Sequence, residues 1–236
     1  THNRYIHSLG AMETATQAFD TIFGGPRSRI GNSNPSDTPT LGPQLSDSTR
    51  ARFRAVVRLA ALLHDIGHGP LSHTTEFAMP QVEDLQVPIL NPNRRQATHE
   101  DYTLKMILDS GLTALLEKSS TLQAIEFYPK HVAALIEPSL PISDDFFHST
   151  IDGETVDFRP ILQQLISSEL DADRMDYLRR DSTASGVSYG HFDFDWLISN
   201  LTCHIENRKC YLSLQHRALY SFEDFLISRF HMFLMV

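Results

Sequence analysis

One apolar segment constrains the fold of this chain more than any other feature. Residues 56–63, Val-Val-Arg-Leu-Ala-Ala-Leu-Leu, are apolar nearly all round a helix, which is typical of a helix buried at the centre of a domain. We expect this helix to run from about Thr49 through Ile66. The apolar run leads directly into His64 and Asp65. Two ionisable side chains therefore stand at the end of an otherwise buried helix, where leaving them without partners would cost several kcal/mol.

A divalent metal ion would satisfy both of these groups at once. Side chains of the metal-ligand type come from three separate segments, as His7, the pair His64 and Asp65, and Asp173. Neutral imidazoles together with two carboxylates suit a divalent transition ion that keeps positions open for water or substrate. A His-Asp pair by itself is weak evidence, because it arises by chance in many chains and also fits a capped, partly exposed helix end.

The residues after the pair favour a site. His68 lies one helical turn beyond His64, so both side chains can line one wall if the helix continues. Two glycines and a proline then break the helix and allow close approach of the backbone. His73 and Glu76 follow, three residues apart. Three histidines and two acids within residues 64–76 are more than a solvent-exposed helix face explains.

Helices are expected over most of the remaining chain. Residues 202–214 form the one convincing strand pair. Residues 24–48 are rich in Gly, Pro, Ser, Thr and Asn, which predicts a long flexible surface loop, either a functional lid or a tolerated insertion. A chain of 236 residues can bury one sizeable core, so we expect a single domain over residues 1–236. Apolar spacing predicts further helices over residues 4–23, 99–116, 120–127, 130–137, 161–180, 192–200 and 217–236. A bend near Asp171 is expected in the helix over residues 161–180.

Bulk composition argues against some classes of partner. The net charge of −9, from 20 basic and 29 acidic residues, argues against binding along a nucleic-acid backbone but not against a small polyphosphate ligand. No apolar run approaches the roughly 20 residues that span a bilayer, so no membrane association is expected. Two cysteines form no disulfide framework, which favours a cytoplasmic protein, or a nuclear one in a eukaryote.

The cysteines and the chain ends lead to two smaller expectations. Cys203 and Cys210 would face each other if Glu206 and Asn207 form the turn of a hairpin, and reduced strand cysteines are favoured over a redox pair. The chain begins at Thr1 without a methionine and ends within an apolar helical pattern, so we expect a fragment of a longer protein.

Four stretches of the chain resemble the HD-domain deoxynucleoside triphosphate triphosphohydrolases. Residues 64–73, His-Asp-Ile-Gly-His-Gly-Pro-Leu-Ser-His, are similar to the signature of that family. Residues 1–10 resemble its first histidine motif, residues 98–100 a third motif, and residues 170–181 the fourth, which carries the last metal aspartate. The motifs follow the same order over nearly the whole chain, although the loop over residues 24–48 departs from the family.

This resemblance implies a fold and a set of site residues. The implied fold is all-α, an HD-domain helical bundle with a small β-hairpin near the C-terminus. The implied metal ligands are His7, His64, Asp65 and Asp173. The implied acid–base and phosphate-contacting groups are His68, His73, Glu76 and His99. The implied substrate contacts are Arg4, Arg174, Tyr177 and Asp181.

Helical spacing agrees with part of this assignment. Asp173, Tyr177 and Asp181 are separated by four residues and then four, so they share one face of the predicted helix. That face can present a metal ligand at one end and a sugar-binding pair at the other. The other expectations for this helix are a structural role for Asp176, core positions for Met175 and Leu178, and surface or interface positions for Arg179 and Arg180.

The resemblance implies hydrolysis of a deoxynucleoside triphosphate to a deoxynucleoside and triphosphate. The native metal stays open among Mn, Fe, Ni, Zn and Mg, and a second Mg²⁺ is expected to arrive with the substrate. In this scheme His73, oriented by Glu76, transfers a proton to the leaving 5′ oxygen, and His68 and His99 stabilise the phosphates. Tyr177 lies against the sugar, where crowding disfavours a 2′-hydroxyl. Asp181 accepts a hydrogen bond from the 3′-hydroxyl.

Two alternatives stay open. One is a different HD phosphohydrolase that acts on a monophosphate, a cyclic nucleotide or an alarmone, and the other is a nucleotide-binding regulatory module without activity. Members of the family commonly form dimers or tetramers, some with nucleotide effector sites, so a homo-oligomer and a nucleotide effector are expected partners. Histidines outside the motifs, His131 among them, are expected to be ordinary surface or core residues.

Overall fold

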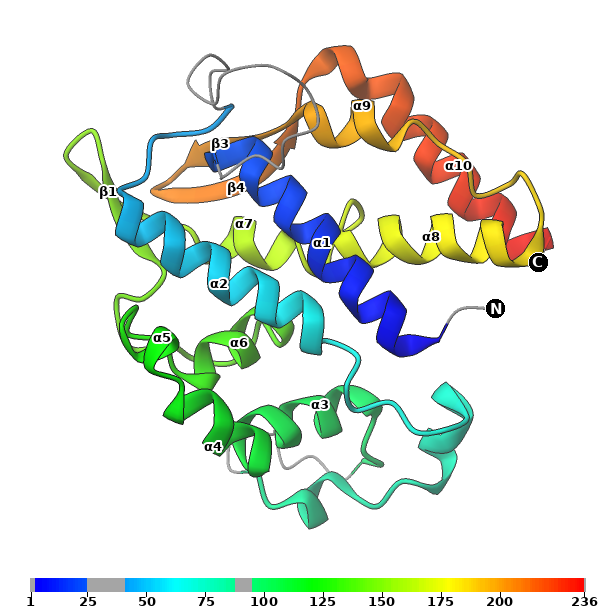
Figure 1. Ribbon diagram of the computed structural model, residues 1–236, viewed down its shortest axis with the longest axis horizontal. Helices are drawn as coiled ribbons and strands as arrows, with labels where there is room; N and C mark the ends of the chain where they lie inside the picture. The colour runs from blue at the N-terminus through cyan, green and yellow to red at the C-terminus, as the bar shows by residue number, and fades with distance from the viewer. Residues whose placement is uncertain (1–2, 25–40, 88–94, 236) are drawn as a thin grey trace.

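Helices form most of the structure, a computed structural model that describes residues 3–24, 41–87 and 95–235 (Figure 1). The predicted all-α class is confirmed in outline, although a four-stranded sheet is also present. The predicted loop over residues 24–48 lies mostly outside the described residues, whereas Asp47 and Ser48 belong to a helix. In chain order the described helices are α1 (Arg4–Phe23), α2 (Asp47–Leu63), the 3-10 helices η1 (Ser72–Ala78) and η2 (Val82–Leu85), α3 (His99–Leu108), α4 (Gly111–Lys118), α5 (Ser120–Gln123), α6 (Pro129–Ile136), α7 (Arg159–Gln164), α8 (Ala172–Ser185), α9 (Phe194–Ser199), the 3-10 helix η3 (His216–Ala218) and α10 (Leu219–Met235).

Helix α1 has the bounds that the sequence predicts, because Asn3 caps it. The side-chain oxygen of Asn3 accepts a hydrogen bond from the Ile6 amide at 3.0 Å, which satisfies one of the free N–H groups at the start of the helix. This cap fixes the first turns of α1, where Arg4 and His7 lie.

Local capping breaks two of the helices that apolar spacing predicts. The predicted helix over residues 99–116 is divided into α3 and α4, because the Ser110 side chain accepts a backbone amide and starts a new helix. The predicted helix over residues 161–180 is divided into α7 and α8, because the Asp171 side chain caps α8. The continuous helix over residues 99–116 is therefore a wrong prediction. The bend predicted near Asp171 is a complete break, after which α8 carries Asp173.

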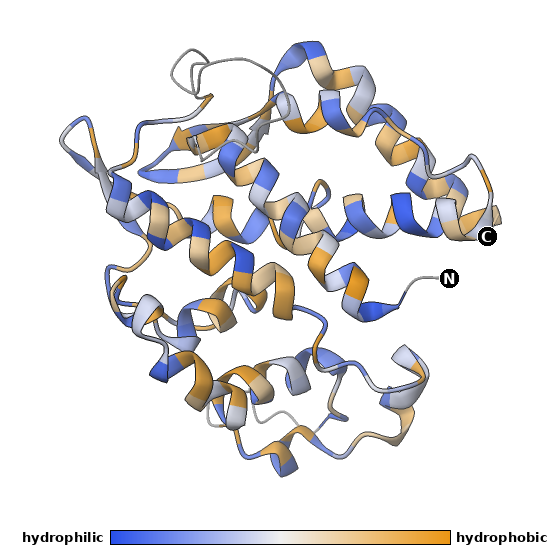
Figure 2. Ribbon diagram, in the orientation of Figure 1, coloured by the Kyte–Doolittle hydropathy of each residue, from blue (hydrophilic) through white to orange (hydrophobic). Residues whose placement is uncertain are grey.

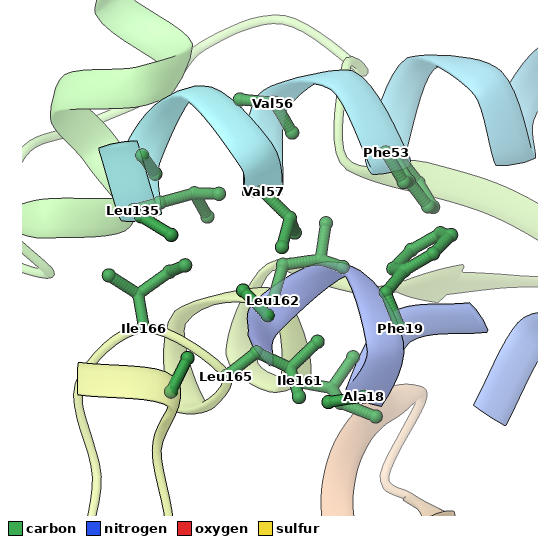
Figure 3. Packing of buried hydrophobic residues seen from close by; sticks show 14 of the residues in the cluster. Ala18, Phe19, Phe53, Val56, Val57, Leu135, Ile161, Leu162, Leu165 and Ile166 are labelled. Carbon is green, nitrogen blue, oxygen red and sulfur yellow. The ribbon is translucent and has the colours of Figure 1, made fainter. Parts of the chain in front are cut away.

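The core lies where α1, α2 and α7 pack together (Figure 3). Phe19 of α1 faces Phe53 of α2, and both are fully buried. The Phe53 ring also packs on Phe158, which precedes α7, with ring centroids 5.5 Å apart. Burying each of these rings stabilises the fold by about 1.5–3 kcal/mol. The apolar run of α2 is therefore the centre of the molecule, as the sequence predicts.

Helix α8 packs against α1 and is largely hydrophilic (Figure 2). Met175 and Leu178 are the exceptions, and each is only 1% exposed, which confirms their predicted core positions. The remaining polar side chains of α8 are therefore available for a site. Among the described helices, none has the length and apolar character needed to cross a membrane.

The sheet has the strand order β1-β2-β4-β3. The predicted hairpin is confirmed as β3 (Leu201–Glu206) and β4 (Lys209–Leu214). A second hairpin, β1 (His148–Ile151) and β2 (Glu154–Asp157), was not predicted. It joins the first through a single parallel pairing of Asp157 with Lys209.

The two cysteines lie on neighbouring strands but not opposite each other. The register pairs Cys203 with Leu212 and Cys210 with Ile205. The predicted turn at Glu206 and Asn207 is therefore wrong, because the turn lies one residue later, after Glu206. The two thiols nevertheless make a side-chain hydrogen bond with each other. Both cysteines are free thiols.

Candidate metal centre and active site

His7 joins α1 to α8. Its side chain lies in the second turn of α1, and the residue is only 7% exposed. Its Nε2 lies 2.9 Å from Asp173 Oδ1, and its Nδ1 lies 2.9 Å from Asp176 Oδ2. Packing of α1 on α8 thus brings the first and last predicted ligands together.

The pair His64 and Asp65 lies just beyond α2, in a turn that is fixed against α3. The Thr103 hydroxyl donates to the His64 carbonyl at 3.0 Å and accepts the Gly67 amide at 3.0 Å. A Cβ at Gly67 would lie 2.1 Å from the His99 carbonyl oxygen, so only glycine allows this approach. The turn therefore sets the distance between the His64–Asp65 pair and α3.

The four predicted ligands converge. His64 Nε2 lies 3.3 Å from Asp173 Oδ1 and 3.5 Å from Asp65 Oδ1. Ligand atoms of His7, His64 and Asp65 all lie within 4.8 Å of one another. Side chains from α1, the end of α2 and the start of α8 thus form one centre, which we call the metal centre: His7, His64, Asp65 and Asp173.

His64 shows that this centre fits a cation. Its Nδ1 lies 2.8 Å from the Ala61 carbonyl oxygen, which makes Nδ1 the N–H donor and leaves the lone pair of the neutral ring on Nε2. Nε2 is buried and makes no well-directed hydrogen bond to any residue that the structure describes. A buried lone pair beside the carboxylates of Asp65 and Asp173 suits a divalent metal ion.

The electrostatics of the metal centre favour positive charge. Burial lowers the pKa of His7, but hydrogen bonds to Asp173 and Asp176 outweigh burial and raise it to about 9. Burial also lowers the pKa of His64, but the neighbouring carboxylates of Asp173 and Asp65 raise it above its ordinary value. Burial raises the pKa of Asp173, but His64 and His7 hold it far below its usual range. A bound cation would take the place of the imidazole protons.

A second group of side chains lies beside the metal centre and consists of His68, His73, Glu76 and His99. Glu76 Oε1 accepts from His99 Nδ1 through a short contact and from His73 Nδ1 at 3.2 Å. His68 Nε2 lies 3.6 Å from Asp65 Oδ1, which links this histidine cluster to the metal centre.

The geometry of the histidine cluster suits proton transfer better than metal binding. Its ligand atoms lie within 4.8 Å of one another. However, the His68 and His99 rings stack with centroids 3.7 Å apart, and the Nδ1 atoms of His73 and His99 are both hydrogen-bonded to Glu76. Burial lowers the pKa of His68 to about 4, which leaves it neutral at pH 7. Hydrogen bonds from His99 and His73 lower the pKa of Glu76 to about 2, which keeps it ionised.

A cavity of about 710 Å³ opens over both groups. Tyr177 and Asp181 line this cavity together with Asp173, as one face of α8 would. Tyr177 and Asp181 also line an apolar pocket of about 800 Å³ between α8 and α10. The cavity and the pocket therefore share a wall. The complete lining of the cavity is Asn3, Arg4, His7, Asp65, His68, His73, His99, Glu100, Asp173, Tyr177 and Asp181.

The two predicted substrate arginines lie in different places. The Arg4 guanidinium lines the cavity and donates to Asp65 Oδ2 at 2.8 Å and to Ser72 Oγ at 2.6 Å. Arg174 is not among the residues that line the cavity, and its Nη1 donates to Glu169 at 2.6 Å. Arg4 is therefore the arginine that the structure places at the cavity.

Two residues near the site were not given a functional role from the sequence. Asp176 was expected to be structural, yet it contacts His7 directly. Its position three residues after Asp173 could have indicated this contact, because residues three apart lie on neighbouring parts of a helix surface. Arg229 of α10 lines the apolar pocket and donates to Glu169 at 2.8 Å. The apolar pattern of the α10 segment did not indicate that Arg229 lines a pocket.

The chain is similar to a known protein family and to several of its members. Residues 4–181 match the HD domain. The chain is 30% identical over 233 residues to the protein YwfO of Bacillus subtilis, across 98% of this chain and 40% of that protein. It is 26% identical over 216 residues to human deoxynucleoside triphosphate triphosphohydrolase SAMHD1, across 87% of this chain and 29% of that protein. The crystal structure of a phosphohydrolase from Bacteroides thetaiotaomicron matches 100% of this chain and 42% of its own, with a TM-score of 0.57 and 26% identity.

The chain spans less than half the length of the curated relatives named here, 40% of YwfO and 29% of SAMHD1. The match to the HD domain nevertheless covers most of this chain, and it includes His7, the pair His64 and Asp65, and Asp173, which meet at one centre. The chain therefore belongs to the HD domain family.

Proposed function

We propose that this chain is a metal-dependent phosphohydrolase that converts deoxynucleoside triphosphates to deoxynucleosides and triphosphate. The observation that carries the proposal is the convergence of His7, His64, Asp65 and Asp173 beside the histidine cluster. Residues of both groups line one cavity: His7, Asp65, Asp173, His68, His73 and His99. The human relative named deoxynucleoside triphosphate triphosphohydrolase SAMHD1 supports the substrate class at 26% identity.

His7, His64, Asp65 and Asp173 would hold one divalent ion, which is Mn, Fe, Ni, Zn or Mg. Such an ion supplies Lewis acidity for the phosphoryl group under attack. Two carboxylates balance the charge of a divalent ion, so the phosphates need further cations. Arg4 meets this need, because a guanidinium suits bidentate contact with phosphate. A second Mg²⁺ that arrives with the substrate is part of the proposal.

The histidine cluster handles the protons. Water adds to the α-phosphorus as the bond to the 5′ oxygen breaks, and the leaving oxygen takes up one proton. In its imidazolium form, His73 is our candidate donor of that proton, because Glu76 accepts the Nδ1–H and leaves the Nε2–H for the substrate. The attacking water gives up the proton that restores the imidazolium. The neutral His68 would donate a hydrogen bond to a phosphate oxygen, and His99, whose Nδ1–H is taken by Glu76, would donate one from Nε2 as an imidazolium.

The nucleoside would lie toward the wall shared by the cavity and the apolar pocket. Tyr177 presents an aromatic surface there, and Asp181 can accept a hydrogen bond from the 3′-hydroxyl. Crowding by Tyr177 would disfavour a 2′-hydroxyl, which accounts for a preference for deoxynucleotides. The predicted role of Arg174 in phosphate binding, the dimer or tetramer, and the nucleotide effector stay predictions.

Product identification tests the proposal. The protein is incubated with dATP and dGTP in Mn²⁺ or Mg²⁺, and the phosphate products are resolved by ³¹P NMR. We expect triphosphate and deoxynucleoside. Pyrophosphate or single phosphates without triphosphate would contradict the proposal, and a panel of monophosphates, cyclic nucleotides and alarmones identifies the alternative substrate.

A double variant separates an enzyme from a regulatory module. His64→Ala with Asp65→Ala is expected to abolish both bound metal and turnover. A matched control is His204→Ala with Asp195→Ala, two exposed positions outside the cavity, which is expected to retain both. Nucleotide binding by the unaltered protein without any turnover would instead support a regulatory module.

A further inference from the structure

Outside the four ligands, the polar contact of the metal centre that remains unexplained is the one between His7 and Asp176. His7 Nδ1 lies 2.9 Å from Asp176 Oδ2, on the opposite side of the ring from Asp173. The His7 side chain is 9% exposed and the Asp176 side chain 8% exposed, so water does not compete for this contact. A neutral imidazole carries one N–H, and only the other nitrogen can bind a metal ion.

Asp176 is itself held in place by Arg180. Arg180 lies one turn later on α8, and its Nε donates to the same Asp176 Oδ2 through a short contact. The guanidinium forms an ion pair with the buried Asp176 carboxylate. A charged carboxylate in this position accepts the Nδ1 proton of His7 and leaves Nε2 free toward Asp173.

Gly10 provides an independent observation, because it makes room for this pair. Gly10 lies one turn after His7 on α1. A Cβ at Gly10 would lie 2.0 Å from Asp176 Oδ1 and 2.1 Å from Arg180 Nη2. Glycine inside a helix is destabilising relative to alanine, so this position has a reason other than helix formation. The geometry supplies that reason: only glycine at position 10 lets the side chains of Asp176 and Arg180 pack against the backbone of α1.

We propose that Asp176, supported by Arg180 and admitted by Gly10, is the positioning residue of the metal centre. It fixes the His7 ring in the Nδ1–H tautomer, so that Nε2 faces the ion. This inference rests on the proposed metal-dependent function and adds a carboxylate that orients a ligand without touching the ion. Such outer partners typically change metal affinity by about 10–100-fold when they are removed.

Metal affinity is the main test, and it needs no turnover. Mn²⁺ is titrated into the full chain at fixed pH, and free Mn²⁺ is followed by electron paramagnetic resonance. Asp176→Asn keeps the side-chain shape, but its amide can present an N–H to His7 and favour the wrong tautomer. We expect Mn²⁺ to bind Asp176→Asn about 10–100-fold more weakly than the unaltered protein.

The tautomer of the His7 ring is a second measurement, and it would not change if Asp176 had a merely structural role. In the Zn²⁺-loaded protein, ¹⁵N NMR is expected to find His7 as the Nδ1–H tautomer, and in Asp176→Asn that signal is expected to be lost or mixed. Arg180→Gln is expected to weaken Mn²⁺ binding less than Asp176→Asn, and Arg180→Lys is expected to restore part of the loss. If Asp176→Asn fails to fold, Arg180→Gln and Arg180→Lys provide the same test, because the Arg180 side chain is partly exposed.

A matched control is available on α1, the helix that carries His7. Asp20 of α1 pairs with Arg54 at 2.8 Å, away from the cavity, so Asp20→Asn removes a comparable carboxylate and is expected to leave Mn²⁺ affinity unchanged. Equal affinity in Asp176→Asn and the unaltered protein would overturn the positioning role and leave the proposed function standing. An unaltered protein that binds no Mn²⁺ or other divalent ion would overturn both.

Discussion

The guanidinium of Arg4 lies 2.8 Å from the carboxylate of Asp65, so the cation that we assign to phosphate binding already contacts a residue of the metal centre. The second arm of the guanidinium donates to Ser72 in the segment that carries His73. Arg4 thus joins the start of α1 to both halves of the candidate active site. Its loss is expected to affect substrate binding more than the fold.

We expect Arg4→Ala to lower kcat/KM for dGTP by about 10–100-fold, because a hydrogen bond to a charged group contributes about 1.5–3 kcal/mol. Most of this change should appear in KM. Arg4→Lys should recover only part of it, since an ammonium cannot make the bidentate contact. Steady-state kinetics at saturating metal checks the prediction. An unchanged KM would assign the phosphate contact to another cation.

His73→Ala is expected to lower kcat by about 10²–10⁴-fold, the usual contribution of a general acid or base. Metal content, measured by elemental analysis, should stay the same, because His73 lies outside the metal centre. Thr74→Ala is a matched control, since Thr74 is an exposed neighbour on η1 that does not line the cavity. A kcat close to that of the unaltered protein would remove His73 from the mechanism.

Tyr177→Ala is expected to reduce the preference for dGTP over GTP by about tenfold, because excluding one small group in a pocket contributes about 1–3 kcal/mol to discrimination. The physical reason is that the smaller side chain leaves space for a 2′-hydroxyl. The ratio of kcat/KM for the two substrates measures the effect. Tyr220→Ala serves as a control, since Tyr220 is 82% exposed and lines neither cavity nor pocket.

His131 predicts a pH dependence of stability that is separate from the site. Its ring stacks on Phe146 with centroids 3.7 Å apart, its Nδ1 accepts the Tyr128 amide at 3.1 Å, and its Nε2 donates to Asp144 at 3.1 Å. Burial lowers the pKa of His131 below 6.5 and outweighs the hydrogen bond to Asp144, which raises it. Folding therefore favours the neutral ring.

The stabilisation from His131 is complete above about pH 6.5 and is lost as the pH falls through its lowered folded-state pKa. Asp144 stays ionised in this window, because Lys130 and His131 overcome the effect of burial and lower its pKa to about 2. We expect the free energy of unfolding to fall below pH 6.5 with a slope of at most about 1.4 kcal/mol per pH unit from this group. Urea unfolding between pH 7.5 and 5 measures it.

His131→Gln should flatten this pH dependence, whereas His204→Gln, at an exposed position on β3, should not. If the slope of the unfolding free energy is the same in His131→Gln and the unaltered protein, another group is responsible for it.

Predictions that depend on apolar spacing held where no side chain interrupted the helix. The bounds of α1 follow from its spacing and from the Asn3 cap. Spacing alone cannot show that the side chain of Ser110 or Asp171 bonds to the backbone and starts a new helix. The β1–β2 hairpin was missed because its strands are only four residues long and carry little apolar pattern.

The site was predictable where motifs fix the chemistry and less so where packing fixes the direction of a side chain. The motifs name His7, His64, Asp65 and Asp173, and the structure brings these four together. Arg174 lies next to Asp173 in sequence, yet it points to Glu169 rather than into the cavity. That direction depends on the path of the chain between α7 and α8, which the predicted bend near Asp171 did not specify.

The order of the ligands along the chain has a consequence for biosynthesis. His7 lies on α1, and Asp173 lies on α8. As the polypeptide leaves the ribosome, two imidazoles and one carboxylate emerge well before the second carboxylate, and they lack the charge to balance a divalent ion. If these four residues hold a divalent ion, as we propose, tight binding of that ion would require translation to have passed α8, and loading would be a late event in the maturation of this domain.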